Sequence, residues 1–184
     1  MMNILDKLVY VARRRSPWLF HLNAGGCNGC DIELVACLTP LYDVEQLGIR
    51  LEGSPRHADI LCVSGPVTRN TRAALETIYA QMLEPKVVVA LGSCPASCNV
   101  FADSPLIEGP LERILPVDVF VPGCPPRPDA IIEGIAQAAA ILGSVDISRN
   151  QLYSQASHTQ NELVSEKCQQ NLAQGGNRMQ KEQP

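Results

Sequence analysis

The stretch Lys86-Val87-Val88-Val89-Ala90-Leu91-Gly92-Ser93-Cys94-Pro95 joins a short apolar run to a turn that presents a cysteine. Two other stretches also join an apolar run to a turn, and the second of these turns presents a cysteine. Residues 59–63 run into Ser64-Gly65-Pro66, and residues 117–121 run into Pro122-Gly123-Cys124-Pro125. Apolar runs that are this short and rich in β-branched residues are typical of parallel strands buried on both faces. The sequence therefore predicts an open parallel sheet.

Helical patterns alternate with these runs. One covers residues 71–83, and another covers residues 129–142, with Pro128 near its start and Gly143 just past its end. Further elements are expected nearer the N-terminus: strands at 17–22 and 47–51, and a helix at 31–38. Strands that alternate with helices predict an α/β fold, here a flavodoxin-like open parallel sheet with flanking helices.

The chain of 184 residues divides into three predicted parts. Residues 1–16 form an amphipathic, N-terminal helical segment, and residues 17–145 form the flavodoxin-like domain. Residues 146–184 are rich in Gln, Asn, Ser and Lys and poor in apolar residues. Such a segment buries too little apolar surface to offset its conformational entropy, so we expect a polar tail that is extended or disordered.

Composition excludes several classes of protein. The net charge is −4, and no basic run follows Arg13-Arg14-Arg15, so we expect no nucleic-acid partner. The apolar run after those arginines is too short for a secretory signal, and no stretch reaches the roughly 20 apolar residues of a membrane span. We therefore expect a cytoplasmic protein. In a reducing compartment, its eight cysteines favour metal binding over a disulfide framework.

Four of the cysteines follow predicted strands. Cys27 and Cys30 form a C-x-x-C pair in Ala24-Gly25-Gly26-Cys27-Asn28-Gly29-Cys30-Asp31-Ile32-Glu33, and Cys94 and Cys124 each follow a later strand. Ligands of open parallel sheets bind outside the carboxyl ends of the strands, so the four thiols should meet at one edge. Structural zinc sites usually combine two C-x-x-C pairs. One pair plus two single cysteines, each followed by Pro, suits a 4Fe–4S cluster better, although zinc remains an alternative.

At this point the motifs carry a resemblance. The chain resembles the small, proximal-cluster subunit of energy-converting, membrane-bound nickel–iron hydrogenases, the formate hydrogenlyase, Ech and CO-induced group. It is also similar to the 20 kDa subunit of complex I. The similarity covers about residues 15–142 and rests on these motifs in order: 24–33, 54–60, 63–68, 84–86, 91–94 and 116–128. The complex I subunits carry two adjacent cysteines where this chain has Cys27 and Cys30, which places it with the hydrogenases.

The resemblance implies an electron-transfer role. One 4Fe–4S cluster, held by Cys27, Cys30, Cys94 and Cys124, would relay electrons to or from a nickel–iron centre on a large subunit. The chain would then be part of an oxidoreductase and carry no catalytic residue of its own. The implied partners are the hydrogenase large subunit, a ferredoxin-like polyferredoxin subunit and integral-membrane subunits, on the cytoplasmic side of the cell membrane. The alternative functions are a quinone- or sulfur-reducing complex of the same superfamily, or a zinc-stabilised binding module.

Other cysteines compete less well for this role. Ser97-Cys98-Asn99 stands where relatives often have a Gly pair, and Cys98 is a rival to Cys94 as a ligand. Cys94 is preferred because it follows its strand directly. Cys37 and Cys62 are expected in the core, since buried free cysteine behaves as a small hydrophobe. Cys168 lies in the predicted tail and is interpreted as a bystander.

Several polar residues are weaker candidates for the function. Glu33 is a candidate for the partner interface or a proton route, or is simply a favourable charge in a first helical turn. Arg56 and His57 are candidates for contact with membrane subunits, or else lie in a solvated turn. Arg69 and Arg127 would offset the charge of the cluster or form surface salt bridges. The chain has no G-x-G-x-x-G motif or P-loop, so nucleotide binding is not expected.

Overall fold

The computed structural model describes residues 11, 12 and 15–144 of the chain. The predicted N-terminal segment, apart from residues 11, 12, 15 and 16, and the predicted tail with Cys168 lie outside these residues. The division of the chain at residues 16 and 145 stays a prediction. In the described part of the chain, no helix has the length and apolar character needed to cross a membrane.

Five parallel strands form the central sheet, in the spatial order β2-β1-β3-β5-β7. They are β1 (Trp18–Asn23), β2 (Arg50–Leu51), β3 (Ile60–Ser64), β5 (Val87–Leu91) and β7 (Val119–Val121). Counted along the chain, this order is 2-1-3-4-5, which is the flavodoxin-like arrangement. The predicted α/β fold with a parallel sheet is confirmed.

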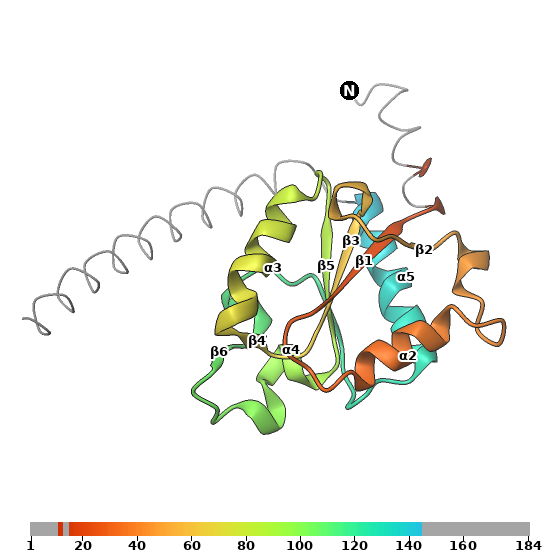
Figure 1. Cartoon of the computed structure of the whole chain (residues 1–184). Coiled ribbons are helices and arrows are strands. Elements are labelled where there is room, and N and C mark those ends of the chain that lie inside the picture. Colours follow the sequence, from red (N-terminus) through yellow and green to blue (C-terminus); the bar gives the residue numbers. More distant parts are fainter. Residues whose placement is uncertain (1–10, 13–14, 145–184) are drawn as a thin grey trace, which may run out of the picture. The chain divides into compact units, whose positions relative to one another are not determined.

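Helices cover both faces of the sheet. Figure 1 shows α2 (Gly29–Cys37) and α5 (Pro128–Ser144) on one face and α3 (Arg69–Gln81) on the other. Side chains of successive strand residues point to opposite faces. In β3, Ile60 and Cys62 accordingly belong to the core under α2 and α5, while Leu61 and Val63 belong to the core under α3. Every residue of β3 is buried, which explains its continuous apolar run.

Some elements differ from the sequence-based expectation. The strand expected at 47–51 is a 3₁₀ turn at Val44–Leu47 followed by the two residues of β2. Gly143 lies inside α5 and not past its end. Short elements went unpredicted because they are too short to produce a periodic pattern: β4 (Val67–Thr68), β6 (Ile107–Gly109), α4 (Ser93–Ser97), η2 (Pro55–His57), η3 (Asn99–Phe101) and η4 (Leu111–Arg113). β4 and β6 pair in an antiparallel ladder.

Candidate metal centre

A cavity of about 70 Å³ opens at the carboxyl edge of the sheet. By the same measure one water needs roughly 10–15 Å³, so the cavity has room for a larger group. It lies where the chain leaves β1, β3, β5 and β7, which includes the switch point of the strand order. Its lining residues are Gly26, Cys27, Cys30, Ser64, Gly65, Cys94, Gly123, Cys124 and Pro125. The structure thus brings together the four cysteines that were singled out in the sequence.

The C-x-x-C pair is held by the turn that starts α2. Asn28 precedes the helix with a φ of 66°, so the chain turns sharply between the two cysteines, and Cys30 lies in the first turn of α2. The side chain of Asn23 organises this loop. Its Oδ1 accepts hydrogen bonds from the backbone N–H groups of Gly25 and Gly26, at 2.9 and 2.7 Å.

Close approaches of backbone make room for the thiols. Gly65 has a φ of +79°, and a Cβ on it would lie 2.2 Å from the backbone N of Gly26. The loops after β1 and β3 therefore touch through residues without side chains. Gly92, directly after β5, has a φ of +90°, and a Cβ there would lie 2.7 Å from the Sγ of Cys30. These glycines leave the cavity free for a group that the thiols surround.

The thiols are electrostatically coupled. Burial raises the pKa of Cys30 to about 11, with smaller contributions in the same direction from Cys94, Asp31, Cys27 and Cys124. Burial is also the largest cause of the raised pKa of Cys94, followed by Cys124 and Cys27. Four thiolates would repel one another in this cavity. A positively charged metal group is what stabilises such a set of thiolates, and its binding releases their protons.

The arrangement of these four thiols bears on which metal group the cavity could hold. In the described part of the chain, no group of three or more His, Cys, Asp or Glu side chains is placed to hold a metal ion. A zinc ion needs its thiolates to converge at about 2.3 Å from one point. A 4Fe–4S cluster takes four cysteines around a larger body. Four thiols from three loops around one cavity are a ligand set of the kind that a 4Fe–4S cluster takes.

The remaining described cysteines lie outside the cavity. Cys98 is buried at the end of α4 with a φ of 61°, and burial raises the pKa of its thiol while Arg113 acts against this. Cys37 and Cys62 are buried completely in the core under α2 and α5, as predicted. Burial raises the pKa of both thiols, to about 11 for Cys37. None of the three lines the cavity.

A polar cluster beside the cavity escaped the sequence analysis. The Ser64 hydroxyl donates a hydrogen bond to Asp31 Oδ1, and His21 Nε2 lies 3.1 Å from the same carboxylate oxygen and 3.1 Å from Ser64 Oγ. Burial lowers the pKa of His21, and the charge and hydrogen bond of Asp31 act in the opposite direction. The only available signal was a pair of polar residues, His21 and Ser64, within strands that are otherwise apolar. The cluster ties α2 to the ends of β1 and β3.

The other polar candidates do not line the cavity. Glu33 is half-buried on α2, and Arg127 is exposed just before α5. Arg69 forms an exposed ion pair with Glu108, at 3.7 Å. Arg56 and His57 lie in η2, which precedes the amino end of β3. This pair is therefore at the opposite edge of the sheet from the thiols.

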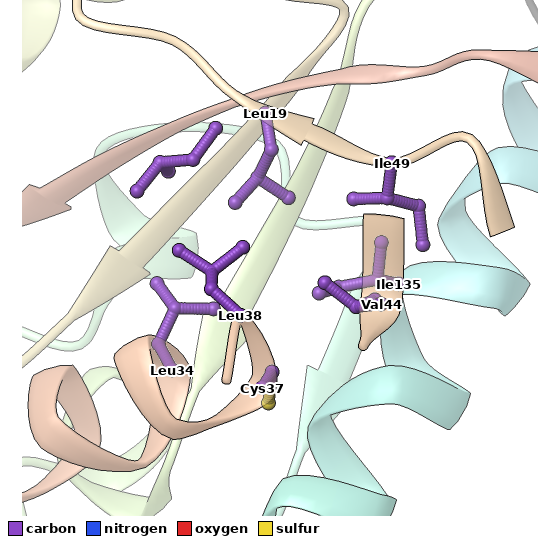
Figure 2. Close-up of a pocket in the computed structure, with 8 residues that line it drawn as sticks. Leu19, Leu34, Cys37, Leu38, Val44, Ile49 and Ile135 are labelled. Carbon is purple, nitrogen blue, oxygen red and sulfur yellow. The ribbon is translucent and has the colours of Figure 1, made fainter. Parts of the chain in front are cut away.

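A second, smaller gap lies in the core between α2, α5 and the strand edge. Figure 2 shows Leu34, Leu38 and Cys37 of the α2 region facing Leu19, Ile49 and Ile135 across it. Its volume is about 10 Å³, which is room for one water at most, and its lining is apolar. We interpret this gap as a packing defect, because it offers no polar group to orient a ligand.

Sequence comparison identifies the family. The family model described as NADH ubiquinone oxidoreductase, 20 kDa subunit, matches residues 27–138. The chain belongs to this family. The probable membrane-bound hydrogenase subunit mbhJ of Pyrococcus furiosus is 58% identical over 131 residues, which are 71% of this chain and 78% of the relative. Formate hydrogenlyase subunit 7 of Escherichia coli K12 is 43% identical over 129 residues, 70% of this chain and 51% of the relative.

Structure comparison adds a chain from another membrane complex. A chain of the membrane-bound sulfane sulfur reductase, an archaeal respiratory membrane complex, superposes with a TM-score of 0.72 at 30% identity and covers 92% of this chain and 96% of its own length. The resemblance to membrane-bound hydrogenase and complex I subunits is confirmed. The family comprises subunits of oxidoreductase complexes and binds an iron–sulfur cluster.

Proposed function

We propose that this chain is the electron-transfer subunit of a membrane-associated nickel–iron hydrogenase, and that Cys27, Cys30, Cys94 and Cys124 hold one 4Fe–4S cluster. The observation that carries the proposal is the meeting of these four thiols, from three separate loops, around one cavity at the carboxyl edge of the sheet. The 58% identity to a membrane-bound hydrogenase subunit supports the choice of partner enzyme.

When bound, such a cluster accepts and donates single electrons. The chain contributes the surroundings that set how readily this happens. Gly92 and Gly65 keep side chains out of the cavity, and Cys94 is almost fully shielded from solvent, with 8% of its surface exposed. Cys27 and Cys124 are exposed, so the cavity is open on their side. That open side is where we place the hydrogenase large subunit, since electron transfer requires a short distance to the partner.

Further partners follow from the proposed assembly. We infer a polyferredoxin subunit that exchanges electrons with the complex, and integral-membrane subunits that hold the chain at the cytoplasmic side of the cell membrane. The relatives from Pyrococcus furiosus and Escherichia coli, which are named as hydrogenase and formate hydrogenlyase subunits, support this assignment. No bond-making active site is proposed on this chain.

The experiment is affinity purification of the tagged chain from its native host, with metal analysis and EPR of the dithionite-reduced complex. We expect nickel, iron in excess of one cluster, and a reduced 4Fe–4S signal that weakens by the contribution of one cluster in Cys94→Ala. Zinc without iron would overturn the proposal and favour a zinc-stabilised binding module.

A second candidate rests on the sulfane sulfur reductase, whose chain superposes along almost the full length. In that case the cluster would serve a sulfur- or quinone-reducing partner. Iron with no nickel in the purified complex would favour this candidate. It would leave the four cysteine ligands and the electron-transfer role unchanged.

A further inference from the structure

Asn99 is exposed and contacts Cys124, one of the two exposed thiols of the cavity. It begins η3, immediately after the short helix α4 that carries Cys94. Cys98 and Asn99 both have positive φ, at 61° and 43°. Asn adopts this left-handed conformation more readily than most residues that carry a side chain. Two turn hydrogen bonds hold the segment: Phe101 N–H to Cys98 O at 2.9 Å and Ala102 N–H to Asn99 O at 3.2 Å.

The carboxamide of Asn99 reaches one of the proposed ligands. Its Nδ2 lies 3.6 Å from the Sγ of Cys124 and donates to it. The amide therefore spans the gap between the loop after β5 and the loop after β7.

We propose that Asn99 is a positioning residue that raises the reduction potential of the cluster by donating a hydrogen bond to the thiolate of Cys124. A ligand thiolate can only accept hydrogen bonds, so it is the N–H side of the amide that faces it. Reduction adds one negative charge to the cluster and its ligands. A donor stabilises this more negative state more than the oxidised one, and hydrogen bonds to the sulfurs are among the levers that set cluster potentials.

Water at the open side also donates to sulfur, but the turn hydrogen bonds hold the backbone from which the amide of Asn99 extends. The change in reduction potential should therefore be specific to Asn99. The inference rests on the proposed function, because it requires the cluster at Cys27, Cys30, Cys94 and Cys124. Asn99 lies outside the set of four cysteines, and the cysteine motifs do not identify it.

The test is an EPR-monitored redox titration of the cluster in the complete purified complex. Asn99→Gly removes the amide and keeps a residue that accepts positive φ, so the turn is retained. Asn99→Asp keeps the shape but replaces the donor with a negative charge. We expect a lower midpoint potential in Asn99→Gly and a still lower one in Asn99→Asp. Ser97→Ala is the matched control, since the Ser97 hydroxyl donates to the Ser93 carbonyl, at 3.1 Å, and should leave the potential unchanged.

Two results would overturn the inference alone. One is an unchanged potential in both Asn99 variants with a normal cluster signal. The other is loss of the cluster from Asn99→Gly, because a residue that only tunes the potential is dispensable for assembly. In either case a normal signal from the wild-type complex would leave the proposed function standing. A wild-type complex with no reducible cluster would overturn both.

Discussion

A Cβ atom added to Gly92 would lie 2.7 Å from the Sγ of Cys30. These two residues come from the loop after β5 and from the start of α2, so the two ligand-bearing loops approach closely at the cavity. Gly92 has φ 90° and ψ 177°, a conformation that is essentially restricted to glycine. The space around the proposed cluster thus depends on Gly92, a residue that supplies no ligand to the cluster.

Gly92→Ala should therefore prevent assembly of the cluster. The substitution would push Cys30 away from its position and add about 1–3 kcal/mol of backbone strain. We expect the iron and acid-labile sulfide of this one cluster to fall to a small fraction of their wild-type content. Gly53→Ala is the control, because a Cβ on Gly53 meets no atom within 4 Å. Full iron content in Gly92→Ala would show that the loops have more freedom than this geometry implies.

Two variants can decide whether Cys94 or Cys98 is the ligand of the cluster. Cys94 lines the cavity, whereas Cys98 is buried outside it and has positive φ. Cys94→Ala should lose the contribution of this one cluster to the 4Fe–4S signal. Cys98→Gly, which preserves the left-handed turn, should retain the signal and its iron. The reverse pattern in EPR and iron analysis would make Cys98 the ligand.

Thiol alkylation of the cluster-free protein should sort the described cysteines by burial. Cys27 and Cys124 are exposed and should react with iodoacetamide first. Cys62 is fully buried, and burial raises the pKa of Cys37 to about 11, so both stay protonated and shielded. Peptide mass spectrometry over time should find these two labelled only after unfolding. Early labelling of Cys62 in the folded protein would contradict the placement of β3 in the core.

Stability should depend on pH through His21. Burial lowers its pKa below the ordinary 6.5. Between the folded-state pKa and 6.5, the unfolded chain binds a proton that the folded chain does not, so the free energy of unfolding falls as the pH drops through this window. Urea unfolding from about pH 8 to about pH 5 should show this loss in the wild type.

His21→Gln should flatten that acid loss, since glutamine does not titrate. His57→Gln removes an exposed imidazole that stacks edge-on against Trp18 and is the matched control. It should keep the wild-type slope. Equal slopes in wild type and His21→Gln would place the acid-sensitive group elsewhere.

Sequence reasoning found the elements that carry a strong pattern. The runs at Ile60–Ser64 and Val87–Leu91 are buried on both faces, so their composition alone indicates central parallel strands. Glycine and cysteine directly after such strands indicate a ligand site at the carboxyl edge. Patterns failed for β4 and β6, whose pairing connects residues far apart in the chain through only two or three positions each.

The sequence by itself determined the fold class and singled out four cysteines, because apolar periodicity and the position of a thiol after a strand are local properties. Its motifs carried the resemblance to the family. Only the tertiary structure decided which residues surround those thiols. Ser64 and His21 meet Asp31 because β1 and β3 are neighbours, and Asn99 reaches Cys124 because the loops after β5 and β7 adjoin. These contacts join residues of no common motif. They exist only once strand order has placed the strand ends side by side.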